Sequence, residues 1–199
     1  MTVHVRNLTC PGCGAPITME HERCSWCRRP IYLTSFSSVY EMGQEELRRV
    51  SGWFQEDLEK EGEVPVKNAS AAMCWLRLGL YDQAVRAFER AIEEHFDQAE
   101  TYFLAAVALM HGQKPFQRTR SEVDRAAAWV QAALRIERQG IYYYLLAYLL
   151  YDFYGRKHLH PGISWQDCLR EALKAGVSRR DVRELHALMK TPWPEQLMF

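Results

Sequence analysis

Four cysteines near the start of the chain have the spacing of a metal site. Cys10 and Cys13 form one C-x-x-C pair, and after ten residues Cys24 and Cys27 form a second. Each pair places two thiolates on one side of a tight backbone bend, and two such bends facing each other make a tetrahedral four-sulfur cage. This donor set suits Zn2+, and a single iron ion is the alternative. A four-cysteine zinc centre has no open coordination position, so we expect these residues to be structural and not catalytic.

The sequence around these cysteines resembles a zinc ribbon, over residues 1–40. Short extended pieces, which fit its small strands, occur at 3–5, 16–19 and 30–33. A module of this size has no adequate core without its metal, so zinc would supply much of its folding free energy. His21 lies between the two pairs and is interpreted as a surface residue, because four cysteines are already available as ligands.

Other motifs that carry chemistry are missing from the sequence. It contains no glycine-rich phosphate loop, no nucleophile elbow and no histidine-rich metal motif, so we expect a protein that is not an enzyme. Cys74 and Cys168 lie within apolar helical stretches and are interpreted as small buried hydrophobic residues. A redox pair would require these two thiols to be adjacent in the fold.

Helical periodicity predicts the elements that follow the cysteine-rich module. Residues 41–67 are expected to form a linking helix at 43–60 and a loop that ends in the strand-like segment 64–66. Further helices are predicted at 68–79, 82–95, 98–111, 121–138, 140–155, 164–175 and 178–190. Ser121, Ser164 and Ser178 are the predicted N-caps, and Ser178 forms a capping box with Asp181.

The stretch from Trp75 to Ala106 has the most regular pattern in the chain. Its ordered positions are Leu78-Gly79-x-Tyr81-Asp82-x-Ala84, then Phe88, Ala91 and Ala99-Glu100-x-Tyr102. This order resembles a tetratricopeptide repeat (TPR), a helix-turn-helix unit of about 34 residues. The resemblance implies that residues 68–199 form a TPR-like solenoid of helical hairpins whose concave face binds another protein. The expected fold class is mainly α, with a small N-terminal zinc-ribbon module.

Composition restricts the choice of partner and compartment. The 199 residues are 48% hydrophobic, and 25 basic residues balance 25 acidic ones. This zero net charge argues against nonspecific electrostatic binding to nucleic acid or to an anionic membrane. The most apolar run, 141–151, is shorter than the ~20 residues that a membrane-spanning helix needs. Six cysteines without an apolar signal segment at the start indicate a reducing compartment, and we expect a cytoplasmic protein.

The expected function is that of a non-enzymatic adaptor or scaffold, which holds a protein segment in the helical groove while the zinc ribbon makes a second contact. The candidate groove and edge residues are Arg77, Tyr102, Tyr143, Tyr144, Arg118 and Arg120. The tyrosine cluster at 142–154 either packs in the core or lines this groove. Two basic loops, 112–120 and 156–162, would form one patch for an acidic peptide or a phosphate if they lie on the same edge of the stack.

A regulator that contacts DNA or RNA through the ribbon is the alternative function. Trp26 would stack on a base, and Arg28 and Arg29 would contact phosphates. The formal charge of residues 1–33 weakens this alternative, because four arginines face two glutamates and a four-thiolate zinc centre adds two negative charges. A third hypothesis is that the protein is a subunit of an enzyme.

Overall fold

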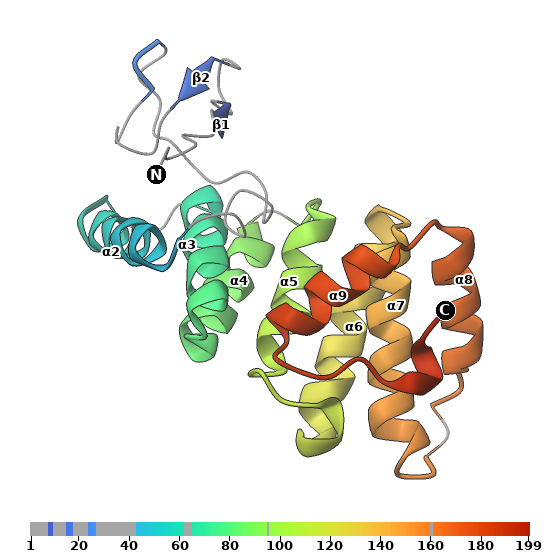
Figure 1. Cartoon of the computed structure of the whole chain (residues 1–199). Helices are drawn as coiled ribbons and strands as arrows, with labels where there is room; N and C mark the ends of the chain where they lie inside the picture. Colours follow the sequence, from blue (N-terminus) through green and yellow to red (C-terminus); the bar gives the residue numbers. More distant parts are fainter. Residues whose placement is uncertain are drawn as a thin grey trace.

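The computed structural model describes residues 8–9, 15–17, 24–26, 43–61, 65–94, 96–159 and 161–199. Within this part the chain is mainly α-helical, as the sequence predicts (Figure 1). The helices follow one another from residue 44 to residue 188, with short turns between most of them. None of the described helices combines the length and the apolar character that crossing a membrane requires.

Two short strands pair near the N-terminus. β1 (Leu8–Thr9) runs antiparallel to β2 (Pro16–Ile17) and forms a small hairpin with it. The connection between the two strands contains the first cysteine pair in its sequence. The strand predicted at 16–19 therefore begins at the expected residue, whereas those predicted at 3–5 and 30–33 lie outside the described residues.

The helices lie close to their predicted positions. They are α2 (Gln44–Glu61), α3 (Pro65–Leu78), α4 (Tyr81–Glu94), α5 (Ala99–Leu109), α6 (Arg120–Ile136), α7 (Gly140–Leu149), α8 (Trp165–Lys174) and α9 (Arg179–Leu188). Three short elements accompany them: the 3-10 turn η1 (Pro115–Gln117), the π-helical turn η2 (Leu150–Gly155) and the 3-10 turn η3 (Glu195–Leu197).

The start of α3 corrects one prediction. Pro65 and Val66, expected to be strand-like, form its first turn. Proline is well tolerated at this position, because the N–H that it lacks would have no partner within the helix. The helical array therefore begins before residue 68, and the boundary expected at 67/68 falls inside α3.

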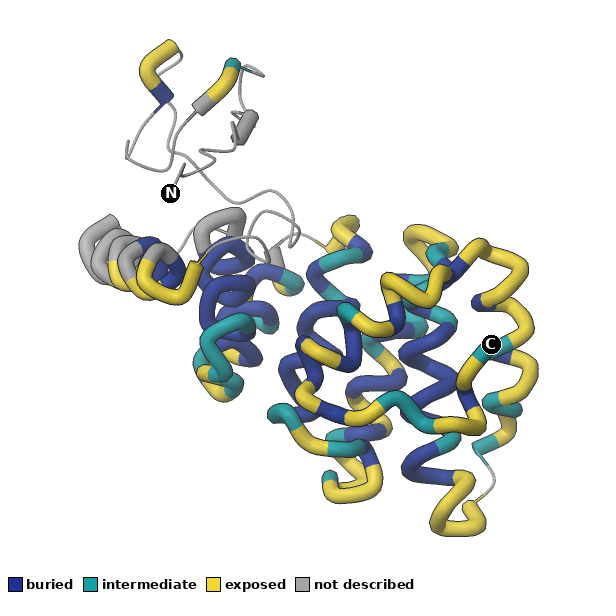
Figure 2. The backbone as a smooth tube through the Cα atoms, in the orientation of Figure 1, coloured by how far each residue is buried: buried dark blue, intermediate teal, exposed yellow. Residues whose placement is uncertain are grey.

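Helices that are consecutive in sequence are also neighbours in space. Each helix from α2 to α7 packs against the next one, so that α3–α4, α5–α6 and α7–α8 form a row of three hairpins (Figure 1). In addition, α3 contacts α5, and α7 contacts α9. One hydrophobic core runs through the row and contains the buried faces of all these helices. Figure 2 shows that α5 and α7 are buried along most of their length, whereas α8 is largely exposed.

The first hairpin shows how the sequence produces this packing. Gly79 adopts a left-handed φ of 80° and lets the chain turn between α3 and α4. Ala84 and Ala87 are buried on α4, and their small side chains let α3 approach closely. Phe88, one turn further along, is completely buried and fills the space beside them. The alternation of small and large residues therefore fixes the spacing of the two helices.

Hydrogen bonds at the helix starts agree with two of the three predicted caps. Ser164 accepts a hydrogen bond from the backbone of Gln166, and Ser178 forms the expected capping box with Asp181. The prediction for Ser121 is wrong, because α6 begins one residue earlier and Thr119 is its N-cap. Thr119 shares a capping box with Glu122, which stands three residues later and so reaches back to the cap backbone.

The last 24 residues, 176–199, form a strap over the face of the row that includes α5 and α7, which we call the inner face. Its helix α9 crosses in front of α5 and α7 (Figure 1). Lys190, just after α9, places its ammonium 5.5 Å from the centre of the Tyr81 ring, at the turn of the first hairpin. Lys190 has a left-handed φ of 53°, and from there the chain runs back until the carbonyl of Phe199 accepts a hydrogen bond from Arg179. We call residues 176–199 the C-terminal strap.

Candidate functional site

Cys24 is the one predicted metal ligand within the described residues. Its side chain is buried, with 1% of its surface exposed, whereas Trp26 in the following turn is 75% exposed. A buried thiol beside an exposed turn fits a ligand that faces the interior of a small metal module. Cys10, Cys13 and Cys27 lie outside the described residues, as does the intervening histidine, so the four-cysteine site stays a prediction.

The two remaining cysteines are core residues. Cys74 on α3 and Cys168 on α8 are both buried, and neither is in a disulfide. Burial raises the pKa of the Cys74 thiol to about 12 and that of the Cys168 thiol to about 11. Both side chains are therefore protonated thiols at neutral pH and have little nucleophilic character. Their interpretation as small hydrophobic residues is confirmed.

The residues predicted to face a groove have different environments. Arg77 on α3, Tyr102 on α5 and Tyr143 on α7 are half-buried, and the two tyrosines pack against the hydrophobic core. Tyr144 is completely buried. The expectation that Tyr144 faces an open groove is therefore wrong, because the C-terminal strap covers that face of α7.

The tyrosine cluster on α7 and η2 belongs mainly to the core. Four of its side chains are buried and two are half-buried; the buried ones are Tyr142, Tyr144, Tyr148 and Tyr154, and the half-buried ones are Tyr143 and Tyr151. Tyr142 packs on Phe103 of α5, with 4.7 Å between the ring centres. Burial raises the pKa of the Tyr148 phenol to about 12, so this group stays protonated. The core-packing interpretation of the cluster is confirmed for its buried members.

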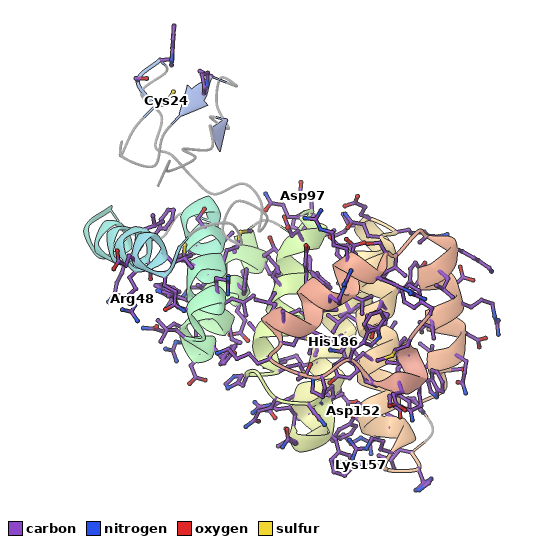
Figure 3. The ribbon with its side chains drawn as sticks, viewed as in Figure 1. Cys24, Arg48, Asp97, Asp152, Lys157 and His186 are labelled. Carbon is purple, nitrogen blue, oxygen red and sulfur yellow. The ribbon has the colours of Figure 1, made fainter. Side chains whose placement is uncertain are left out.

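A buried histidine joins the strap to α7. His186 of α9 has its Nε2 atom 2.9 Å from the Tyr144 hydroxyl and its Nδ1 atom 3.0 Å from the Thr191 hydroxyl (Figure 3). Its ring also lies edge-on to Tyr148, at 4.9 Å between centres. Burial lowers the pKa of His186 to about 4, so the imidazole is neutral at pH 7. One ring nitrogen then donates to its hydroxyl partner and the other accepts.

Aromatic side chains of the tail complete the cover over this network. Trp193 lies parallel to His186, and its ring contacts Phe199, which in turn contacts Tyr144. The indole N–H of Trp193 donates to the carbonyl of Leu197, so the polar edge of the ring has a partner. The strap is thus held by specific contacts along its whole length, not by a single anchor.

A cavity of about 500 Å3 remains where the strap meets the starts of α5 and α7. Its wall includes the apolar residues Phe103, Leu104, Ile141, Val177, Leu185 and Leu188. Glu100, Arg138, Arg180 and Glu184 stand at its polar side, and the last two form an ion pair with each other. Packing between the strap and the inner face is therefore incomplete on this side.

The two basic loops lie on the same edge of the molecule, as the patch hypothesis requires. The 3-10 turn η1 of the first loop packs on the π-helical turn η2, which leads into the second. Asp152 joins them, because its carboxylate accepts a 2.8 Å hydrogen bond from the backbone N–H of Phe116 and a 2.9 Å bond from Arg156. Figure 3 shows Asp152 and Lys157 near this edge. His160 lies outside the described residues.

Part of the positive charge in these loops is paired. Arg118 forms an ion pair with Glu122, and Arg120 lies 3.6 Å from Asp124. The Arg118 side chain is only 14% exposed, whereas that of Arg120 is 70% exposed. Of these two predicted edge residues, Arg120 is accessible to a partner and Arg118 mainly fixes the start of α6.

The residues that hold the strap and the loops in place are not among the predicted site residues. His186 lies on the apolar side of the 178–190 pattern, and this position is the signal that identifies it as a buried polar group. Asp152 directly follows the apolar run 141–151, so the sequence marks its position. Its hydrogen-bond partner, the backbone N–H of Phe116, lies 36 residues earlier. Such long-range partners have no local signature.

No protein-family model matches this sequence, and no curated protein is significantly similar to it.

Proposed function

We propose that this protein is a non-enzymatic adaptor in which a TPR-like solenoid binds a segment of a partner protein. The stack of hairpins α3–α4, α5–α6 and α7–α8, with the contact between α3 and α5, supports a solenoid arrangement. In such arrays the inner face is made by the first helix of each hairpin, here α3, α5 and α7.

The observation that carries this proposal is the position of α9. An amphipathic helix lies on the inner face and buries Val182, Leu185 and Leu188, while its other side is exposed. Helix-in-groove binding uses the same kind of spaced apolar anchors. The inner face therefore already binds one helix, from the chain itself, so a partner segment would pack beside α9 or contact an edge of the stack that α9 leaves exposed, such as the one at Arg120.

We further propose that Cys10, Cys13, Cys24 and Cys27 bind Zn2+ and that this ribbon provides a second contact with the partner. The burial of Cys24 supports this assignment, and four thiolates would give the ion a closed, structural coordination shell. A cytoplasmic location is part of the same proposal, because thiolate ligands persist in a reducing compartment.

The test of the adaptor function is co-purification of partners with the tagged full-length protein, with nuclease treatment in one arm and an untagged control. A photo-reactive amino acid placed at Arg120, which is exposed, or at Arg170 on the outer side of α8 would locate the contact. A nuclease-resistant protein that crosslinks at position 120 and not at position 170 supports the proposal. Failure to recover any protein in excess of the control rejects it.

A regulator that contacts nucleic acid through the ribbon is the second candidate. The specific observation in its favour is the exposure of Trp26, since an accessible indole is a platform on which an unpaired base stacks. Binding to single-stranded DNA or RNA that weakens steeply with salt and is lost in Trp26→Ala would favour this candidate. Partners that vanish on nuclease treatment would point the same way.

A further inference from the structure

The edge formed by η1, η2 and the loop after η2 carries an aromatic ring that contacts two cations. The guanidinium carbon of Arg156 lies 4.3 Å from the centre of the Phe116 ring, and the ammonium of Lys157 lies 5.1 Å from it. Lys157 is also 3.8 Å from the centre of the Phe153 ring. Contacts of this kind orient both cationic side chains without neutralising their charge.

The carboxylates near this edge are already engaged or buried. Asp152 is 4% exposed at its side chain and accepts hydrogen bonds from Phe116 and Arg156. Asp124 accepts a hydrogen bond from the hydroxyl of Tyr154 and faces Arg120. Within the part of the chain that the structure describes, Lys157 has no carboxylate at ion-pair distance. Two of the three cations at this edge, Arg156 and Arg120, are therefore paired with carboxylates, and Lys157 adds the positive charge that is in excess.

An apolar cavity opens beside these cations. It has a volume of about 520 Å3, and its wall includes Leu150, Leu159, Ile163 and Trp165. Leu159 and Ile163 are 39% and 45% exposed, so part of each side chain is accessible to a partner at this cavity. Gly155 and His158 line the same cavity and flank Arg156 and Lys157 in the sequence, so cavity and cations belong to one loop.

The part of this loop from Arg156 to Leu159 has a defined backbone conformation. The backbone N–H groups of Arg156, Lys157 and Leu159 donate to carbonyls of η2, at 3.2, 3.2 and 2.8 Å. His158 adopts a left-handed φ of 54°, which turns the chain toward the cavity. A surface whose backbone is already ordered loses little entropy on binding, and this favours recognition of a short segment.

From this arrangement we infer that the edge is a docking site for an acidic peptide segment that carries one bulky aliphatic residue. The aliphatic side chain enters the cavity between Leu159 and Ile163, and flanking carboxylates face Lys157, Arg156 and Arg120. This inference rests on the proposed adaptor function and names the chemistry of one partner segment. Charge complementarity selects this occupant, since Arg156 and Lys157 stand between two residues that line the pocket, and no carboxylate is among the described residues that line it.

The size of the charged surface argues against a larger anionic partner. Neutralising a nucleic-acid backbone takes an extended basic stripe, and binding an anionic membrane takes a cluster of about four to eight basic residues. Here the accessible cations are Lys157 and the two ion-paired arginines Arg120 and Arg156, and the chain as a whole has no net charge. A short acidic peptide matches both the number of charges and the apolar pocket.

The experiment measures fluorescence anisotropy of a labelled peptide with one leucine between runs of glutamate, mixed with the full-length protein. Its matched peptides replace the glutamates with glutamine or the leucine with serine. We expect each replacement to weaken binding about five- to tenfold, and added salt to weaken binding of the glutamate peptide only. Equal binding of the glutamate and glutamine peptides would overturn the inference.

Two pairs of protein variants locate the site. Lys157→Glu is expected to weaken binding of the acidic peptide about tenfold, whereas Lys174→Glu at the far end of α8 leaves binding unchanged. Ile163→Asp is compared with Leu173→Asp, because both residues are 45% exposed and only the first lines the cavity. Circular dichroism and melting curves confirm that all four variants are folded. If both members of a pair behave alike, the site lies elsewhere.

The outcomes also separate this inference from the adaptor function. If Lys157→Glu captures the same nuclease-resistant partner as the natural protein, the adaptor function stands and this docking site is rejected. If the peptide binds as expected but no partner is recovered, the docking site stands and the adaptor function is rejected. Tighter binding of an oligonucleotide or of phosphatidylserine vesicles, lost in Lys157→Glu, would also overturn the peptide assignment.

Discussion

The His186 side chain is buried and forms two hydrogen bonds. This pair of bonds, one donated and one accepted, requires a neutral imidazole. The hydroxyls of Tyr144 and Thr191 bond to its two ring nitrogens, and the hydrophobic tail excludes water from them. Protonation would place a positive charge in this enclosed site with no carboxylate among the contacts described for it. The folded protein therefore resists protonation of His186 far more than the unfolded chain does.

This resistance predicts a loss of stability in acid. The pKa of His186 is about 4 in the folded protein against 6.5 for an ordinary histidine, so between these pH values the unfolded chain binds the extra proton. Stability therefore falls as the pH drops from 6.5 toward 4, by about 3 kcal/mol from this residue. Urea unfolding across this range measures it. In His186→Gln, which does not titrate, the decrease should be smaller by that amount; an equal decrease would contradict the assignment.

Replacing Cys24 is predicted to remove the metal ion from the proposed four-cysteine site. We expect the purified protein to contain about one zinc ion per chain, and Cys24→Ser to lose most of it, because three thiolates hold zinc much less tightly than four. Cys168→Ser is the control, since it also replaces a buried cysteine but lies on α8. Elemental analysis by mass spectrometry gives the zinc content. A natural protein without zinc, or one containing iron, would contradict the assignment.

Among the elements, α6 offers a direct test of helix capping. Thr119 accepts a hydrogen bond from the backbone of Glu122, whereas Ser121 lies inside the first turn and is exposed. Thr119→Ala should lower the free energy of unfolding by about 1 kcal/mol, while Ser121→Ala should change it by less than about 0.5 kcal/mol. Chemical denaturation of the two variants gives both values. The reverse order would show that α6 begins later than residue 120.

A second test concerns the end of the strap and its contribution to the stability of the fold. Leu197 in η3 is completely buried, and its neighbour Met198 is 52% exposed. Leu197→Ala should destabilise the protein by about 2 to 4 kcal/mol through lost burial and a residual cavity, and Met198→Ala by less than about 0.5 kcal/mol. Thermal and urea unfolding measure the difference. Similar values for both variants would mean that the tail contributes little to the fold.

The positions of the helices are the part of the fold that the sequence predicts best. Apolar residues at helical spacing located every helix from α2 to α9 within a few residues, because each helix needs a continuous buried stripe whatever its partner. The strand-like prediction at Pro65 is wrong because a proline at the first position of a helix has the same local signature as a proline in a turn. Core packing of Tyr144 is one of the two sequence-based expectations, but the strap that covers it cannot be predicted, since it begins more than 30 residues later and depends on tertiary contacts.

Across the whole molecule, most contacts join neighbours in the row, and the strap is the exception. A row of hairpins in which each contacts only the next tends to unfold from its ends, one hairpin at a time. Lys190, however, rests on Tyr81 of the first hairpin, and Phe199 returns to Tyr144 of the third. The strap therefore ties the two ends of the row into one cooperative unit. Without it, melting would spread over separate steps; with it, the hairpins should be lost together in a single transition.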